Sequence, residues 1–392
     1  MSAADAAAHV YAEERSRILA TLIRLTGNWD LAEECVQDAF ERALQRWPEE
    51  GVPRRPGAWL TTVARNRALD RMRRDANEVV KLRSLPVAAG DDEEWPDDRL
   101  RLVFTCCHPA LPLEARVALT LRTVAGLSTV QIARAFLVPT ATMAQRITRA
   151  KRKIADAAIP YRVPPPELLG ERLGGVLAVV YLVFNEGYSA RSELAEEAVR
   201  LGRLLLQLMP TETEVRGLLA LMLVQQSRAG ARVDARGDLV PLEEQDRSRW
   251  DQPRIDEGLT LLTGTATPYQ LQAEIAACHA RARAATETDW PRVVRLYTRL
   301  ASIVPSPVVA LNRVVAIAMA DGPATALPLL DELETSDLLA GYHLLPAVRA
   351  DLLRRLGRSR EAAEQYARAL AAAPDEPERR YLRRRLAETS TP

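Results

Sequence analysis

Residues 127–154, LSTVQIARAFLVPTATMAQRITRAKRKI, carry the pattern that decides the fold of this part of the chain. Ser128 followed by Gln131 three residues later is a capping box and predicts a short helix through Ala135. A tight turn ends at Pro139, and a second helix is predicted over 140–154. The apolar stripe of this second helix is formed by Met143, Ile147, Ala150 and Ile154. Two short helices joined in this way indicate a helix-turn-helix.

The second of these helices is basic. It contains five positive residues and no acid: Arg146, Arg149, Lys151, Arg152 and Lys153. Residues near the start of a recognition helix face base edges, and arginines and lysines near its end face phosphates. The predicted DNA contacts are Thr142, Gln145, Arg146, Arg149, Lys151 and Arg152, with Ala141 beside them. The alternative is an amphipathic helix whose basic face is only solvated.

A second basic segment lies at residues 54–74, RRPGAWLTTVARNRALDRMRR, where seven arginines accompany one acid. Its apolar residues recur at helical spacing. Asn66 and Asp70 lie four residues apart on the arginine side and supply hydrogen-bonding groups that phosphate neutralisation does not need. The predicted nucleic-acid contacts are Arg65, Asn66, Asp70, Arg71, Arg73 and Arg74. A solvated face is again the alternative, and Trp59 is interpreted either as a core residue or as a platform for a base.

Composition predicts an almost entirely helical protein. The chain has 392 residues, of which 47% are hydrophobic but only 5% aromatic, and its net charge is +1. Ala, Leu, Arg and Glu favour helices, and the length indicates two or three domains. Because the charge is balanced, any nucleic-acid site must be local.

No enzymatic motif is present, so we expect no catalytic residue and no cofactor. The four cysteines lack metal-ligand spacing, and Cys106-Cys107-His108 is interpreted as core packing at a helix end rather than a zinc site. The scattered cysteines and the lack of an apolar leader predict a cytoplasmic protein.

Proline-rich and acidic segments divide the chain. We expect a helical domain over 1–80, with one helix ending at Pro48, then an acidic linker over 81–98. A helix-turn-helix domain over 99–160 follows, and a further break at 160–166 precedes a helical extension over 167–392. Small, aromatic and proline residues recur in the extension 69 residues apart, about two tetratricopeptide periods of 34. The matching sets are Val293, Tyr297, Leu300 and Pro305, and Ala362, Tyr366, Ala369 and Pro374. They predict a tetratricopeptide-like (TPR-like) solenoid.

Taken together, residues 10–160 resemble a bacterial sigma factor of the extracytoplasmic-function group. The segment 27–47, GNWDLAEECVQDAFERALQRW, is similar to the part that docks on the clamp helices of the largest polymerase subunit. The segment 56–74 is similar to the part that reads the melted minus-ten element, and 127–154 to the helix-turn-helix for the minus-35 element. The resemblance implies that the chain binds core RNA polymerase and promoter DNA. It also implies a polymerase-facing ridge formed by Gln37, Asp38, Phe40 and Glu41. Phe40 also fits the apolar stripe of its helix, so it is interpreted either as a ridge residue or as one shared between core and interface. Pro139 departs from the family, which more often has Ser at that N-cap.

The remaining residues resemble the subgroup with a long TPR-like extension in place of dependence on a membrane anti-sigma factor. The phrases FTCCHPAL, residues 104–111, and DARGDLVPLEEQDRSRWD, residues 234–251, are typical of it. The resemblance implies that the extension controls activity, with a small DGPF-type protein as one candidate regulator. The second phrase is interpreted either as a structural loop or as a regulatory contact through Asp234, Arg236, Gly237, Asp238 and Trp250.

Two other functions stay open from sequence. A TPR-type peptide-binding scaffold with remnant N-terminal helices would not bind polymerase. A one-component helix-turn-helix regulator would bind duplex DNA tightly and salt-sensitively without polymerase.

Overall fold

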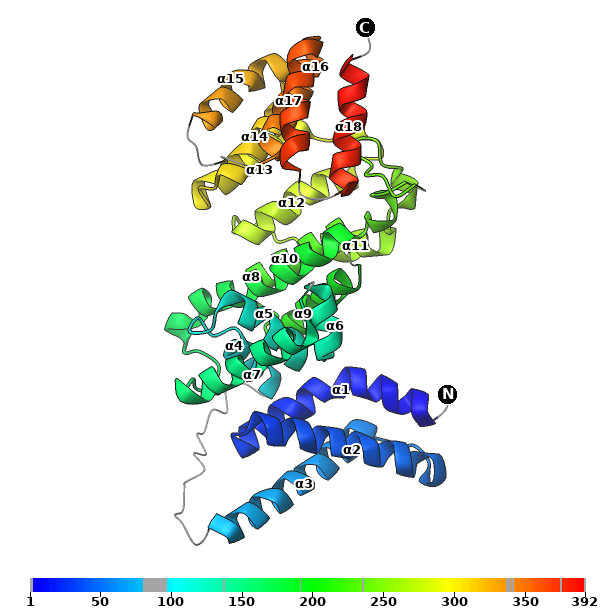
Figure 1. The fold of residues 1–392 in the computed structure, drawn as a ribbon, viewed down its shortest axis with the longest axis vertical. Coiled ribbons are helices and arrows are strands. Elements are labelled where there is room, and N and C mark those ends of the chain that lie inside the picture. The colour runs from blue at the N-terminus through cyan, green and yellow to red at the C-terminus, as the bar shows by residue number, and fades with distance from the viewer. Residues whose placement is uncertain are drawn as a thin grey trace. The chain divides into compact units, whose positions relative to one another are not determined.

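The computed structural model describes residues 3–79, 97–136, 138–190, 192–234, 236–335, 339, 342–373 and 376–390. These residues form eighteen α-helices, three short 3-10 helices and no strand (Figure 1). The prediction of an all-helical fold is confirmed. The chain divides into two compact units, Met1–Glu186 and Gly187–Pro392. Unit 1 therefore includes residues 167–186, which the sequence analysis assigned to the extension. Most of the predicted acidic linker, residues 80–96, lies outside the described residues.

Three long helices open unit 1: α1 (Ala3–Thr26), α2 (Trp29–Glu50) and α3 (Pro56–Val79). Asn28 caps α2, because its Oδ1 accepts hydrogen bonds from the backbone N–H groups of Asp30 and Leu31 at 3.0 and 3.1 Å. The expectation that this helix ends at Pro48 is wrong, since α2 continues to Glu50. Only two helical residues follow the proline. Gly51 then ends the helix with a φ of 81°.

Four shorter helices follow: α4 (Asp98–Cys106), α5 (Leu113–Thr123), α6 (Thr129–Ala135) and α7 (Thr140–Asp156). The capping box of α6 is present in full: the backbone N–H of Ser128 donates to Gln131 Oε1 at 2.8 Å, and that of Gln131 to Ser128 Oγ at 3.2 Å. Pro139 stands at the N-cap of α7 and supplies no side-chain acceptor. The predicted stripe of α7 is buried throughout. Both helices of the predicted helix-turn-helix are therefore present.

Helix α8 (Pro166–Ala190) lies in unit 1 up to Glu186, together with the helix-turn-helix. Arg172 Nη2 donates to the carbonyl oxygen of Phe104 at 2.9 Å, at the end of α4. In the segment that leads into α8, Tyr161 Oη donates to the carbonyl oxygen of Ala20 in α1 at 2.9 Å. The connection between α7 and α8 is thus tied to both halves of unit 1.

Unit 2 is a succession of helices that pack on their neighbours in the chain. They are α9 (Ser192–Leu208), α10 (Thr213–Gln226), α11 (Gln252–Thr260), α12 (Pro268–Arg281), α13 (Trp290–Ile303), α14 (Pro307–Ala320), α15 (Pro323–Glu334), α16 (Leu344–Arg355), α17 (Ser359–Ala372) and α18 (Glu376–Ser390). Three short 3-10 helices lie between them: η1 (Ala229–Ala231), η2 (Arg247–Arg249) and η3 (Ala285–Glu287). Close backbone approach requires Gly217, because a Cβ there would lie 2.6 Å from the backbone nitrogen of Gln270.

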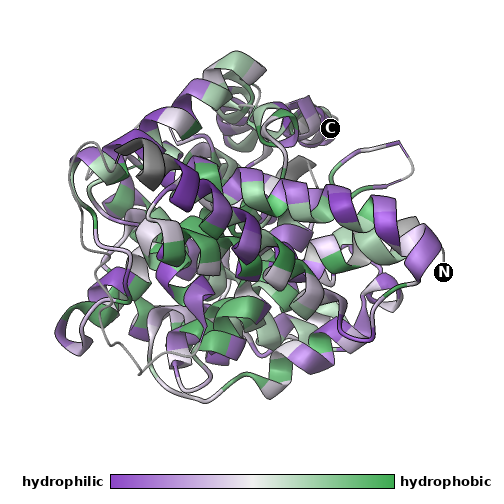
Figure 2. Cartoon of the chain, turned by 90° about the horizontal axis from the view of Figure 1, so that it is seen from below, coloured by the Kyte–Doolittle hydropathy of each residue, from purple (hydrophilic) through white to green (hydrophobic). Residues whose placement is uncertain are grey.

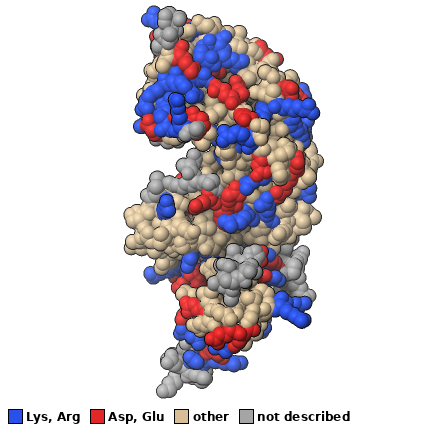
Figure 3. All heavy atoms as spheres, turned by 90° about the vertical axis from the view of Figure 1, so that its right-hand side faces the viewer, with Lys and Arg blue, Asp and Glu red and all other residues tan. Residues whose placement is uncertain are grey.

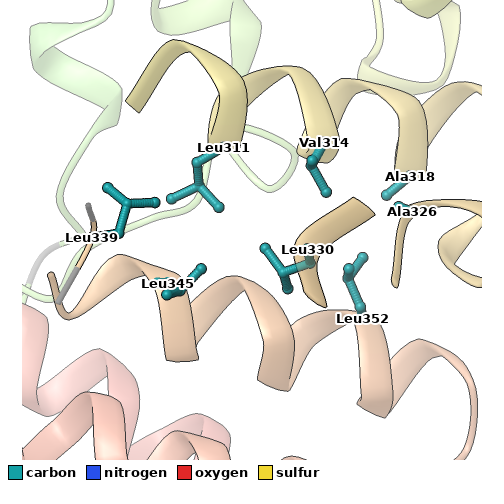
Figure 4. Packing of buried hydrophobic residues seen from close by; sticks show 8 residues of the cluster. All are labelled: Leu311, Val314, Ala318, Ala326, Leu330, Leu339, Leu345 and Leu352. Carbon is teal, nitrogen blue, oxygen red and sulfur yellow. The ribbon is translucent and has the colours of Figure 1, made fainter. Parts of the chain in front are cut away.

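Leucine, valine and alanine side chains hold consecutive helices of unit 2 together. Leu311 and Val314 of α14, Leu330 of α15 and Leu352 of α16 meet in one cluster (Figure 4). The alanine and tyrosine positions of the last predicted repeat, Ala362, Tyr366 and Ala369, are at most 2% exposed. Burial of these positions is what stacked helical hairpins require. The tetratricopeptide character of the repeat itself stays a prediction.

The helices are amphipathic, and Figure 2 shows hydrophilic and hydrophobic residues alternating along them. Side chains of both charge signs are interspersed on the surface drawn in Figure 3, in keeping with a net charge of +1. No described helix combines the length and the apolar character needed to cross a membrane.

The cysteines are core residues. All four are buried, and in the described part of the chain no group of three His, Cys, Asp or Glu residues is arranged to hold a metal ion. Cys106 Sγ lies 3.1 Å from Thr123 Oγ1, and Cys107 Sγ lies 3.5 Å from Thr120 Oγ1. Burial raises the pKa of Cys107 to about 11 and also raises that of Cys106.

The burial of these thiols predicts their reactivity. Because the thiolate is the reactive form and the side chains are inaccessible, we expect the native protein at pH 8 to show almost no thiol reactive toward a disulfide reagent. The same protein in concentrated urea should show four. Rapid reaction of Cys106 or Cys107 in the native protein, located by mass spectrometry, would contradict the assigned packing.

Candidate nucleic-acid interface

Helix α3 uses its arginines in two different ways. On the side toward α2, Arg67 Nε donates to Asp38 Oδ2 at 2.8 Å, and Arg71 pairs with Glu34. The hydrogen bond to Asp38 raises the pKa of Arg67 above its ordinary value. These two arginines fasten α3 to α2. The other predicted arginines of the segment, Arg65, Arg73 and Arg74, are exposed.

The outer face of α3, defined here by Thr62, Arg65, Asn66, Asp70 and Arg73, is exposed. Spacing of three and four residues places these side chains on one side of a helix. Arg73 lies 4.0 Å from Asp70, a long contact between side chains that are 77% and 58% exposed. Arg65 and Asn66 have no side-chain hydrogen bond or ion pair within the described residues, and Arg74 is exposed beside them. The structure therefore brings together the predicted residues, except that Arg71 is occupied by Glu34.

Trp59 packs against α2. Its ring makes an edge-to-face contact with Trp47 of α2, with a centroid distance of 5.7 Å. The side chain is only half-buried, but this packing favours the core interpretation over a base platform.

The predicted ridge on α2 is divided by burial. Gln37 and Glu41 are exposed and joined by a hydrogen bond from Gln37 Nε2 to Glu41 Oε1 at 2.9 Å. Asp38 is half-buried and holds Arg67. Phe40 is 6% exposed, and its ring packs edge-to-face on Tyr11 at 4.7 Å. Phe40 is therefore buried, because the aromatic ring fills the space between α1 and α2. Burial agrees with the core part of its double interpretation, and its role in the polymerase-facing ridge stays a prediction.

Leu44 is the exposed apolar residue that sequence reasoning missed on this helix. It is 51% exposed, and with Gln37 and Glu41 it lines a cleft of about 630 Å³ bordered by α1, α2 and Arg122 of α5. Its position four residues after Phe40 placed it on the apolar stripe. The sequence signal that could have found it is a leucine at the edge of an apolar stripe, because exposed apolar residues can mark a contact surface.

The recognition-type helix α7 keeps most of its predicted contacts exposed. Thr142, Gln145 and Arg149 are exposed, whereas Arg146 is half-buried. These side chains line a second cleft, of about 620 Å³, together with residues 110–112, 114 and 115. Arg152 Nε lies 3.5 Å from Asp156 Oδ2 on the same helix, and both side chains are largely exposed. An exposed pair of this kind is weak and easily exchanged for a phosphate.

Lys151 is the exception on α7. Its Nζ lies 2.9 Å from Asp30 Oδ1 and 3.2 Å from Glu33 Oε1, both at the start of α2. The Lys151 side chain is only 14% exposed. In this arrangement it is held by α2 and is not available to a phosphate, unlike the prediction from sequence.

Further contacts accompany this pair. Arg15 of α1 is 5% exposed, and its Nη1 donates to the carbonyl oxygens of Arg122 and Thr123 at 3.3 Å each. Arg24 Nε donates to Asp98 Oδ2 at 3.0 Å. Helices α1 and α2 thus share a polar contact with the helix-turn-helix part, which we call the α2–α7 contact and define by Lys151, Asp30, Glu33, Arg15 and Arg122.

The loop residues proposed as a regulatory contact are engaged within unit 2. Asp234 Oδ1 accepts hydrogen bonds from the backbone N–H groups of Arg236 and Asp238, each at 2.8 Å, and Gly237 has a φ of 77°. Arg380 of α18 donates to Asp238 Oδ1 at 2.6 Å and to the carbonyl oxygen of Gly237 at 2.8 Å. Trp250 is 7% exposed. These contacts favour the structural interpretation of the loop, and Arg236 is its exposed member.

Three family models match the chain. Residues 10–78 match Sigma-70 region 2, residues 101–154 match Sigma-70 region 4, and residues 172–266 match a family of unknown function, DUF6596. The chain is 45% identical over 395 residues to the uncharacterized protein R00370 of Rhizobium meliloti, an alignment that covers 95% of this chain and 93% of that protein. It is 28% identical over 152 residues to the ECF RNA polymerase sigma factor SigE of Mycolicibacterium smegmatis, covering 37% of this chain and 58% of SigE.

The region 2 model spans α1 to α3 and includes the outer face of α3. The region 4 model spans α4 to α7 and includes the basic helix α7. The chain is an extracytoplasmic-function sigma factor with a C-terminal extension. Sigma-factor families are transcription regulators rather than enzymes. The region 2 and region 4 parts of this sigma factor are the two halves joined by the α2–α7 contact.

This contact predicts a specific chemical cross-link. The sigma factor has three lysines, Lys81, Lys151 and Lys153. A carbodiimide joins an amine directly to a carboxylate without a spacer, so we expect an amide bond between Lys151 and Asp30 or Glu33, detected by peptide mass spectrometry. Lys153 is exposed on the same helix and serves as the internal control. A Lys151→Arg variant should lose the product. Cross-linking of Lys153 to α2 at an equal yield would contradict the geometry.

Proposed function

We propose that this sigma factor directs core RNA polymerase to one promoter class, reading the minus-ten element with α3 and the minus-35 element with α7. The observation that carries the proposal is the division of arginines on α3. Arg67 and Arg71 bind α2, whereas the outer face presents Arg65 and Arg73 to solvent beside two hydrogen-bonding side chains.

The outer face of α3 has the chemistry that a melted promoter strand needs. Opening a base pair costs a few kcal/mol, and binding of the unstacked base to polar groups offsets that cost. Asn66 and Asp70 supply such groups, and Arg65, Arg73 and Arg74 lie close enough along the helix to neutralise phosphates. Arg71 joins them when the DNA displaces Glu34. Gln37, Glu41 and Leu44 of α2 form the surface offered to polymerase, with Asp38 and Phe40 supporting it from behind.

Helix α7 supplies the second contact. Thr142, Gln145 and Arg146 stand near its N-terminus, where a recognition helix approaches base edges. Arg149 and Arg152 lie further along the helix and suit phosphates. Lys151 joins this group only when it leaves Asp30 and Glu33.

The α2–α7 contact is an arrangement that must open for promoter binding. The two elements are centred about 25 base pairs apart, which is roughly 85 Å of B-DNA. A compact unit of the size of Met1–Glu186 has a radius of gyration of about 16 Å. Helices held together through the α2–α7 contact cannot reach both elements, so we infer that polymerase or DNA separates region 2 from region 4.

The extension is suited to control this opening because its first helix is part of the region 4 structure. The DUF6596 match begins at residue 172, within α8, and Arg172 is the residue that binds the carbonyl oxygen of Phe104. A displacement of α8 therefore acts directly on the end of α4. Control through the extension, by a DGPF-type protein or another regulator, is part of the proposal.

Transcription in vitro tests the assigned roles. With purified core polymerase and fragmented genomic DNA, we expect start sites that depend on the added protein. Asn66→Ala and Asp70→Ala should each lower open-complex formation about tenfold, since one base contact contributes roughly 1–3 kcal/mol. Polymerase affinity should not change. A template with mismatched minus-ten base pairs needs no opening and should restore most of the lost activity. If both variants instead lose polymerase affinity, the role of the outer face is wrong.

The same assay separates the alternatives. A scaffold would give no polymerase binding and no start site. A one-component regulator would bind duplex DNA alone, with a steep dependence on salt.

A shortened chain tests control by the extension. A protein ending at Glu186 retains every contact of unit 1 described above. We expect its transcription level and its Lys151 cross-linking yield to differ severalfold from those of the full chain, after thermal melting has shown that it folds. More transcription with less cross-linking means that the extension keeps the two regions closed, and the opposite result means that it supports opening. Equal values in both measurements would exclude control through the α2–α7 contact.

A further inference from the structure

Unit 2 contains a cavity of about 210 Å³ that the sigma-factor function does not use. It lies between the loop before η2, the end of α12, the turn at η3, and helices α13 and α14. We call it the extension pocket and define it by six of its lining residues: Arg247, His279, Thr288, Trp290, Tyr297 and Asn312.

One wall of the extension pocket carries an uncompensated positive charge. Arg247 lines this wall, and Arg228 and Arg232 lie outside the lining. All three are half-buried, and none forms a salt bridge within the part of the chain that the structure describes. Arg247 Nη1 donates to the carbonyl oxygen of Ala282 at 2.8 Å and to that of His279, and its guanidinium lies 4.7 Å from the ring centroid of Trp250. Burial lowers the pKa of Arg247, and the charge of Arg228 lowers it further. Partly buried charges in proteins are ordinarily paired.

The neighbouring polar groups add donors without adding a negative charge. Burial, together with Arg228 and Arg247, lowers the pKa of His279 to about 4, so its imidazole is neutral at pH 7 and offers one N–H. Thr288 is 6% exposed, and its buried Oγ1 has no hydrogen-bond partner in the described structure. A buried hydroxyl without a partner is uncommon, and it stands here in the wall of a cavity.

The rest of the pocket lining is mainly apolar and aromatic. The rings of Trp290 and His279 meet edge to face at a centroid distance of 5.1 Å, and Val293 and Ala316 are buried behind them. Asn312 and Glu243 line the pocket as exposed side chains, and the exposed Glu287 is the carboxylate that acts on Arg247 from a distance. These carboxylates disfavour a ligand with several negative charges. A ligand with a single negative charge is still compatible with the pocket.

We propose that the extension pocket binds a single carboxylate carried on a small aromatic or branched apolar body. The carboxylate would lie against Arg247, Thr288 and His279, and the apolar body against Trp290 and Tyr297. The volume equals that of roughly seven water molecules, which suits a group about the size of phenylacetate. Either a free acid or the C-terminal residue of a peptide presents this chemistry.

Isothermal titration calorimetry on the full chain tests the proposal. The probes are phenylacetate, its neutral amide, and an N-acetylated tripeptide that ends in phenylalanine, used as the free acid and as the C-terminal amide. We expect the acids to bind at least tenfold more tightly than the matching amides, because the charged group contributes the strongest hydrogen bonds. Tighter binding of phenylacetate indicates a free acid, and tighter binding of the peptide acid indicates a protein terminus.

Variants locate the binding site. Thr288→Val preserves shape and removes the hydroxyl, so it should weaken acid binding about tenfold. Thr286→Val, two residues away and exposed outside the pocket, is the matched control and should bind like the parent. Arg247→Gln should abolish binding, and thermal melting shows whether this variant folds. Absence of heat with every probe, equal affinity for acid and amide, or unchanged binding in Thr288→Val would each overturn the proposal. Binding is measured without polymerase or DNA, so its failure is separate from a failure of the promoter roles.

Discussion

The closed arrangement of unit 1 depends on one buried guanidinium. Arg15 comes from α1, yet its Nη1 donates to the carbonyl oxygens of Arg122 and Thr123, at the C-terminal end of α5. The last carbonyl groups of a helix have no partner within the helix, so a donor from elsewhere must satisfy them. Region 2 therefore completes a helix of region 4. Burial removes water from Arg15, and the two carbonyl oxygens replace the lost hydrogen bonds. The two parts are therefore held together more specifically than by apolar burial alone.

The acidic start of α2 extends the same contact. Glu33 lies 3.2 Å from Lys151 and 3.8 Å from Arg122, so one carboxylate serves cations from both α7 and α5. Asp30, which pairs with Lys151, is 85% exposed and contributes less, since exposed ion pairs are screened by salt. A contact made of one buried arginine and a few partly exposed charges is specific in its geometry but inexpensive to break. Those are the properties that the proposed separation of region 2 from region 4 needs.

Local patterns predicted the helices well, and long-range contacts account for what sequence missed. The capping box at Ser128 and the stripe beginning at Met143 are set by residues three or four positions apart, and both were predicted correctly. The partner of Lys151 lies 121 residues away, and no spacing rule connects Lys151 with Asp30. Phe40 was ambiguous for a related reason. Its place on the apolar stripe was readable, but the ring of Tyr11 that covers it comes from another helix.

The near-zero net charge of the chain conceals how unevenly its arginines are satisfied. In α18 the guanidinium groups are engaged, as Arg380 and Arg385 show through contacts with Asp238 and Glu244. Arg65 on the outer face of α3 and Arg247 in the wall of the extension pocket have no salt bridge within the described structure. Composition cannot distinguish these cases, because it counts charges without their neighbours. An arginine that folding has not paired remains able to bind an anion from outside. Such residues therefore separate surfaces available for recognition from surfaces used up by the fold.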